Sequence, residues 1–270
     1  MIVKDFMVTK SQQIIEFRNV SFKFKDHVIL DNISTTINAG KITTLIGRNG
    51  AGKTTFLRLS SGLLKPSNGD VFLNARSLSD MSSKERALKI GVVQQLPFAP
   101  DEMKVKDLVM LGRYPHLGIF AQESKKDILA VEEALKKVEC LPLAMRTIGS
   151  LSGGEKRKIF IARALAQGAD IFLMDEPTAN LDLDAQLNIF ALLQKLASEG
   201  ATILVVLHDV NQASIFCDKV ILLHECSILA EGKPDQVLTE KHLSDVYNVK
   251  TTIFPADEKF PRLVVPVVSN

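Results

Sequence analysis

The 270-residue chain has no tryptophan, only three cysteines and no long hydrophobic run. Cys140, Cys217 and Cys226 lack C-x-x-C spacing and form an odd set, which disfavours a disulfide framework and indicates a reducing compartment. We expect them to be buried thiols. No stretch approaches the ~18 apolar residues that span a bilayer, and Met1–Lys10 lacks the apolar segment of a signal peptide. If the protein works at a membrane, a partner must hold it there.

A strong excess of one charge is also missing. The chain has 33 Lys and Arg residues against 31 Asp and Glu residues, a net charge of +2, and no basic run longer than "KRK" at Lys156–Lys158. Beyond this weak basic bias, binding to nucleic acid has no electrostatic support, and we expect no nucleic-acid partner. A hydrophobic content of 46% is ample for a core, so the chain should form one large domain, or one domain with a subdomain.

Strand-like and helix-like segments follow one another along the chain. Apolar residues recur at three- or four-residue intervals between about Val105 and Gln167, which predicts a helical subdomain inserted in a sheet. Two apolar strands flank the helical pattern of Leu187–Leu196, as expected for parallel strands covered by helices. The expected strands span residues 14–24, 33–37, 42–46 and 71–73, and two further strands end at Met174 and Leu207.

The segment "GRNGAGKT" fits the pattern G-x-x-x-x-G-K-[ST], directly after an apolar strand and before a helical segment. We call Gly47–Thr54 the phosphate loop. Its glycines allow backbone amides to curl round phosphate oxygens, and the helix that follows adds positive potential. Lys53 would reach the β- and γ-phosphates, and Thr54 would hold Mg²⁺. The alternative is a glycine-rich turn with a solvated lysine, which the strand and helix context disfavours.

The segment "IFLMDEPT" provides two adjacent carboxylates after a buried strand. Asp175 would hold Mg²⁺ beside the phosphates, and Glu176 would orient or deprotonate the attacking water. The alternative is that these acids only cap the next helix.

Four motifs occur in a fixed order along the chain: the phosphate loop, "LSGGE", "LMDEPTANLD" and "VLHD". On these motifs the chain, as far as about Val249, resembles the nucleotide-binding subunit of an ATP-binding cassette (ABC) transporter. The resemblance implies an α/β fold of the P-loop NTPase type, with a mixed, mainly parallel core sheet, an N-terminal antiparallel β subdomain and an inserted helical subdomain. It places the ATPase domain at residues 12–250 and the helical subdomain at about 96–165, and it leaves 251–270 unassigned. It also implies that ATP is bound with Mg²⁺ and hydrolysed.

By resemblance, the signature segment Leu151–Glu155 completes a site on another subunit. Ser152, Gly153 and Gly154 would contact the γ-phosphate of ATP held by the partner, and Asp182 would lie across the dimer interface. Exposed amides at a helix start attract anions, which agrees with this role. Ser152 and Asp182 would also pass as ordinary helix N-caps, and capping and anion binding use the same geometry.

Three more assignments rest on the resemblance. Gln95, with Gln94 as its neighbouring competitor, would sense Mg²⁺ or the attacking water, and His208 would act as a switch against the γ-phosphate. Phe24 stands where the family usually has a tyrosine that stacks on adenine, and a core phenylalanine is the alternative. The residues expected to cradle the phosphates are Gly47, Arg48, Asn49, Gly50, Ala51, Gly52, Lys53, Thr54 and Thr55; Arg48 departs from a common proline.

One phosphate loop and one signature segment cannot complete a sandwiched site alone, so the resemblance implies a homodimer, or a heterodimer with a related subunit.

The segments Leu108–Phe120 and Leu207–Ala213 resemble importers of iron-siderophore complexes, haem or cobalamin, with zinc and manganese importers as competitors. The partners would be membrane permeases and, indirectly, a periplasmic or lipoprotein binding protein. The chain itself would lie at the cytoplasmic face of the inner membrane. Leu108–Phe120 could dock the permease or form a buried connection. A soluble regulatory ABC ATPase and a small-molecule kinase are the other classes, but a kinase has no use for "LSGGE".

Overall fold

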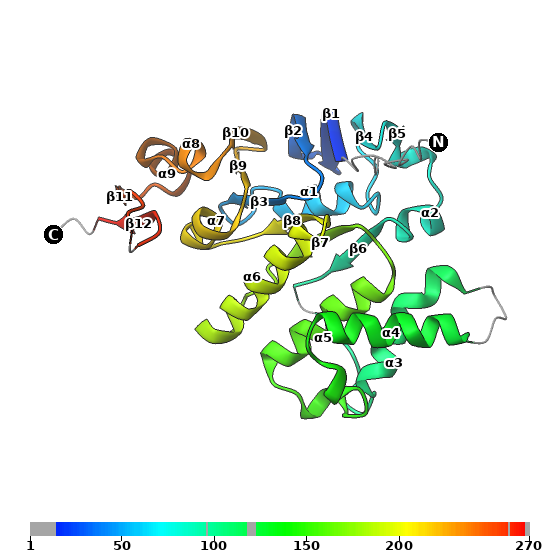
Figure 1. Ribbon diagram of the computed structural model, residues 1–270. Helices are drawn as coiled ribbons and strands as arrows, with labels where there is room; N and C mark the ends of the chain where they lie inside the picture. Colours follow the sequence, from blue (N-terminus) through cyan, green and yellow to red (C-terminus); the bar gives the residue numbers. More distant parts are fainter. Residues whose placement is uncertain (1–14, 96, 118–122, 259, 268–270) are drawn as a thin grey trace, which may run out of the picture.

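A computed structural model describes residues 15–95, 97–117, 123–258 and 260–267 (Figure 1). Its centre is a six-stranded sheet in the order β10-β9-β3-β8-β7-β6, in which β10 is antiparallel to β9 and the other pairs are parallel. This agrees with the predicted mixed, mainly parallel sheet. The strands are β3 (Ile42–Gly47), β6 (Ile90–Val93), β7 (Ile171–Asp175), β8 (Thr202–Val206), β9 (Lys219–His224) and β10 (Ser227–Gly232).

A second, antiparallel sheet in the order β2-β1-β4-β5 covers one face of the central sheet (Figure 1). The alternation of side chains along β7 explains the two layers, because successive residues of a strand point to opposite faces. Ile171 and Leu173 pack with the antiparallel sheet, whereas Phe172 and Met174 pack in the core on the helical side. The strands are β1 (Ile15–Phe24), β2 (His27–Ile37), β4 (Asn68–Leu73) and β5 (Arg76–Ser77).

Helices cover the sheet, and those between β6 and β7 form a separate layer that corresponds to the predicted inserted helices (Figure 1). Helix α1 packs in the core shared with the antiparallel sheet, whereas α5 packs in the core on the opposite side. The helices are α1 (Lys53–Ser60), α2 (Ser83–Ala87), α3 (Val105–Met110), α4 (Lys125–Lys137), α5 (Gly153–Ala166), α6 (Leu183–Ser198), α7 (Val210–Phe216), α8 (Pro234–Val237) and α9 (Glu240–Tyr247), with short 3-10 turns η1 (Leu78–Asp80), η2 (Leu111–His116), η3 (Leu141–Leu143) and η4 (Ile148–Ser150).

The C-terminal segment, for which the sequence predicted no element, forms a hairpin of β11 (Thr251–Phe254) and β12 (Leu263–Pro266). Cys140 and Cys217 are buried as expected, whereas Cys226 is partly exposed, so the prediction of a buried thiol is wrong there. Within the described ranges, every helix is too short or too polar to cross a membrane.

Candidate active site

The phosphate loop connects the end of β3 to the start of α1, as the sequence predicted. Two of its glycines are required by the surroundings. At Gly47 (φ +151°) a Cβ would lie 2.5 Å from the carbonyl oxygen of Leu223, and at Gly52 (φ +95°) it would lie 2.8 Å from Leu30 Cδ2. A side chain at either position would push the loop away from β9 or β2. The loop backbone therefore lies tightly against the sheets and leaves its other side open, where Arg48, Asn49 and Gly50 are exposed.

The side chain of Lys53 folds back against the phosphate loop and bonds to its backbone. Its Nζ donates to the carbonyl oxygens of Gly47 and Arg48 at 2.8 and 3.0 Å, and the residue is only 7% exposed. Burial lowers the pKa of Lys53, while the nearby carboxylates of Glu176 and Asp175 act in the opposite direction. A buried cation without a salt bridge, beside an open ring of amides, is suited to an anionic ligand.

Thr54 and Asp175 bring two oxygen donors together at the carboxyl ends of the strands. Thr54 Oγ1 donates to Asp175 Oδ2 at 3.2 Å. Burial raises the pKa of Asp175, and the hydrogen bond from Thr54 partly offsets this effect. Hydroxyl and carboxylate oxygens are the ligands that Mg²⁺ prefers, so this pair fits Mg²⁺. The described residues contain no group of three or more His, Cys, Asp or Glu side chains placed to hold a metal ion, so phosphate oxygens or water would provide the remaining ligands.

Glu176 lies between two of the other predicted residues. Gln95 Nε2 donates to Glu176 Oε2 at 2.6 Å, and His208 Nε2 contacts Glu176 Oε1. The backbone NH of Glu176 donates to Val206 O at 3.2 Å, which ties the residue to the end of β8. The structure thus brings Gln95 to the carboxylate, and its competitor Gln94 precedes it in the same segment.

The signature residues lie elsewhere. Ser152 is the N-cap of α5: its Oγ accepts from the NH of Glu155 at 3.3 Å, while its own NH donates to Glu155 Oε2 at 2.8 Å. Asp182 caps α6 and accepts from the NH of Ala185 at 2.8 Å. Ser152, Gly153, Gly154 and Asp182 line one depression together, and no phosphate-loop residue borders it. The signature residues are therefore placed together but away from Lys53.

Phe24 ends β1 and is 63% exposed, so the alternative of a core phenylalanine is wrong. It pairs with His27 at the start of β2, the strand that provides the contacts below Gly52. The exposed ring of Phe24, on β1 next to β2, is therefore available for stacking.

Arg157 is a residue of the site that sequence reasoning missed. It is 8% exposed, and its guanidinium donates to the carbonyl oxygens of Gln94 and Gln95 at 3.0 Å each. From the sequence alone, Arg157 was interpreted only as part of the short basic run Lys156–Lys158. A usable signal was its helical spacing, because Arg157 precedes the buried Ile161 by four residues and so belongs to the buried face of α5.

A phosphate loop after a central parallel strand, with carboxylates after another strand of the same sheet, defines a P-loop nucleoside triphosphatase. The family model for ABC transporters matches residues 30–179. The iron(3+)-hydroxamate import ATP-binding protein FhuC of Bacillus subtilis is 39% identical over 231 residues, 85% of this chain and 86% of FhuC. The chain belongs to the ABC transporter family, as an ATP-binding subunit that hydrolyses ATP.

Solved structures agree with this assignment. A transporter described as of the metal-chelate type, in an inward-facing conformation, is 29% identical with a TM-score of 0.84, over 95% of this chain and 98% of that chain. A dimeric bacterial ABC transporter cassette is 31% identical with a TM-score of 0.72, over 82% and 98% of the two chains. The predicted fold class is confirmed.

Proposed function

We propose that this ATPase works as a homodimer that binds two ATP molecules between its subunits and drives a separate permease. The observation that carries the proposal is the separation of the two halves of the site. Lys53, Asp175 and Glu176 gather on one side of the molecule, whereas Ser152 and Asp182 line a different depression. A second copy, turned about a two-fold axis, would bring the signature residues to ATP on the first. The dimeric cassette to which the chain is similar supports this arrangement.

Each side chain has a role in this scheme. The amides of the phosphate loop and Lys53 bind the β- and γ-phosphates, and the ring of Phe24 stacks on adenine. Thr54 and Asp175 would hold Mg²⁺, with Gln95 nearby; the ion would neutralise charge on the phosphates. Glu176 orients the attacking water and accepts its proton, and His208 faces the γ-phosphate. Ser152, Gly153, Gly154 and the positive end of α5 face the γ-phosphate of the partner's ATP.

The cargo that we propose is an iron chelate. FhuC is an iron(3+)-hydroxamate import ATP-binding protein, and a similar solved transporter is described as of the metal-chelate type. Zinc, manganese or cobalamin import is the runner-up, and a soluble regulatory ATPase is a more distant alternative. The subunit would lie at the cytoplasmic face of the inner membrane, and a binding protein outside would deliver the chelate. Copurified permease, tested for the loaded binding protein that raises ATP turnover, would identify the cargo.

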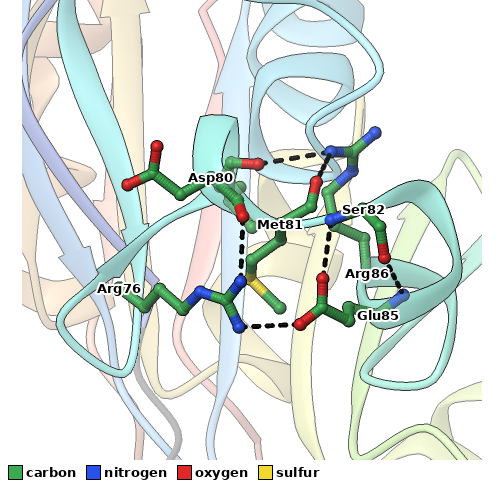
Figure 2. A network of polar contacts seen from close by, with 7 residues as sticks. Arg76, Asp80, Met81, Ser82, Glu85 and Arg86 are labelled. Atoms are coloured by element: carbon green, nitrogen blue, oxygen red, sulfur yellow. Dashed lines mark hydrogen bonds and ion pairs between the residues drawn. The ribbon is translucent and has the colours of Figure 1, made fainter.

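A groove beside Gln95 is the surface that we propose for the permease. Leu63, Val92 and Gln95 border it, and Leu63 and Val92 are 72% and 41% exposed. Arg86, on the α2 side, donates to Leu78 O at 3.2 Å and to Met81 O, which fixes α2 to η1 (Figure 2). A rigid wall with exposed apolar side chains suits a protein partner.

The segment Leu108–Phe120 is partly buried and partly exposed. Leu108 is buried, whereas Leu111 and Tyr114 are 45% and 74% exposed. The alternative of a buried connection is therefore wrong for these two side chains, which are available to a partner. Ile119 and Phe120 lie outside the described residues.

The replacement Glu176→Gln tests the proposed homodimer. Without its general base the variant should still bind ATP but hydrolyse it roughly 10²- to 10⁴-fold more slowly, so the closed dimer should accumulate. Size-exclusion chromatography with and without ATP measures this shift. Wild-type protein run with ATP is the matched control, because it returns to the monomer as ATP is consumed. A Glu176→Gln variant that stays monomeric under saturating ATP would contradict the proposal.

A further inference from the structure

Arg157 connects the start of α5 to the segment after β6. The two terminal nitrogens of its guanidinium donate to successive backbone carbonyls, Nη1 to Gln94 and Nη2 to Gln95, at 3.0 Å each. A planar fork matches two neighbouring acceptors, and the single ammonium of a lysine could not reproduce this geometry. Burying an arginine costs solvation free energy unless its donors are satisfied. These two bonds satisfy donors of a side chain that is 8% exposed.

The connection continues from Gln95 to the carboxylate that we assign to water activation. Gln95 Nε2 donates to Glu176 Oε2 at 2.6 Å, so one residue receives Arg157 on its backbone and contacts Glu176 with its side chain. Burial lowers the pKa of Arg157, and the negative charge of Glu176 acts in the opposite direction, so the two charged groups interact.

The other end of the connection is the signature segment. Arg157 follows the N-cap Ser152 by less than two helical turns, within the same helix α5. The capping box of Ser152 and Glu155 makes this first part of the helix rigid. If the N-terminus of α5 moves, the guanidinium of Arg157 should therefore move with it.

We infer that Arg157 is a positioning residue that couples the signature end of α5 to Glu176 of the same subunit by holding the backbone of Gln95. The inference rests on the proposed function, in which this end of α5 contacts ATP held by the partner copy. When that ATP shifts α5, the carbonyls of Gln94 and Gln95 follow the guanidinium, and the side chain of Gln95 reorients the carboxylate. Arg157 thus makes hydrolysis at one site depend on occupancy of the other.

A double-mutant cycle on the full-length dimer tests this role. Arg157→Ala should lower kcat roughly 10- to 100-fold, the scale of a misplaced catalytic group, and change KM for ATP less than about twofold. Arg157→Lys, which keeps the charge and can reach one carbonyl, should retain an intermediate kcat. In a Gln95→Ala background, Arg157→Ala should cost less than about twofold more, because both changes interrupt one path.

Lys156→Ala is the matched control, because Lys156 is the preceding residue of α5 and its closest acidic partner is Asp101 Oδ1 at 4.0 Å. It should keep the wild-type rate. Thermal melting of every variant separates misfolding from mispositioning, and Arg157→Lys keeps the test valid if Arg157→Ala does not fold.

Losses that multiply in the double variant, or a raised KM with unchanged kcat, would overturn the role of Arg157. The proposed function fails separately, if wild-type protein does not hydrolyse ATP or Glu176→Gln does not dimerise.

Discussion

Glu176 is the residue at which the polar contacts of the site converge. Its φ of +47° lies in the left-handed region, which is uncommon for a residue other than Gly, Asn or Asp. Both carboxylate oxygens have a partner, Gln95 on one and His208 on the other. Each carboxylate oxygen can accept a second hydrogen bond, so these contacts fix the orientation of Glu176 and leave it able to accept a proton. The three side chains therefore act as one unit.

Replacing Lys53 tests whether this side chain binds ATP. In Lys53→Met the cation that we propose to face the phosphates is lost. We expect the Kd for ATP to rise about 10- to 100-fold, because a hydrogen bond to a charged group contributes roughly 1.5–3 kcal/mol. Titration with a fluorescent ATP analogue measures the change. Lys125→Met removes the same charge from an exposed position at the start of α4 and should leave the Kd unchanged. Equal affinities of the wild type and Lys53→Met would refute the assignment.

Local patterns made the residues of the phosphate loop predictable, because the loop, its strand and its helix are contiguous in sequence. Arg157 was not predictable in the same way. Its acceptors are the backbone carbonyls of Gln94 and Gln95, 63 and 62 residues away, and a carbonyl carries no residue identity that a pattern could match. Only the folded chain shows why a charged residue is buried there.

A buried ion pair holds elements of the helical layer together. Arg113 in η2 and Asp127 in the first turn of α4 are 2.9 Å apart, with side chains 6% and 7% exposed, and Arg113 also donates to Ala166 O at the end of α5. Hydrogen bonds from Ser124 and from Arg113 lower the pKa of Asp127 to about 2. Asp127 thus links α4 to η2 directly, and Arg113 extends the connection to the end of α5.

We expect Asp127 to make the stability of the protein depend on acid. Its folded pKa of about 2 lies below the unfolded value of about 3.9, so its stabilisation is complete above that value and is lost as the pH falls toward 2. The gap in urea midpoint between wild type and Asp127→Asn should therefore shrink from pH 5 to pH 2. Asp184→Asn, on the exposed surface of α6, is the control. A gap that stays constant across this range would show that ionisation of Asp127 is irrelevant to stability.

The hairpin of β11 and β12 shows the limit of sequence reasoning for elements. Its strands have four residues each, which is too short for a hydrophobic period to be recognised in the sequence. Tertiary contacts hold it instead: Asn211 in α7 accepts from the NH of Val264 at 2.7 Å and donates to the carbonyl of Val264 at 3.1 Å. The long, periodic helices α4 and α6 were predictable, because their apolar spacing reflects their own packing.

At the scale of the molecule, two cores on the two faces of the central sheet separate the halves of the site. Helix α1, which begins at Lys53, packs in one core, and α5, which begins after Ser152, packs in the other. The order of motifs along the chain predicted both halves, and the resemblance predicted that they act in different subunits. The sequence contains no measure of their separation, which is set by the packing of the inserted helices.

Mixing two inactive variants tests whether the halves work across subunits. Lys53→Met disables the phosphate loop, and Ser152→Arg places a bulky cation at the signature, so each homodimer should be inactive. In a mixed dimer, the loop of the Ser152→Arg subunit faces the intact signature of the Lys53→Met subunit, and one site is restored. Random pairing of two closed C2 partners at equal amounts gives about half mixed dimers, so about a quarter of the sites should regain a complete set of residues. Because Arg157 also makes hydrolysis depend on the second site, which stays defective here, these sites should turn over more slowly than wild-type sites but faster than those of either parent. Single-turnover hydrolysis measures the recovery, and differently tagged subunits confirm the pairing. Mixed dimers as inactive as their parents would show that each subunit does not complete the site of the other.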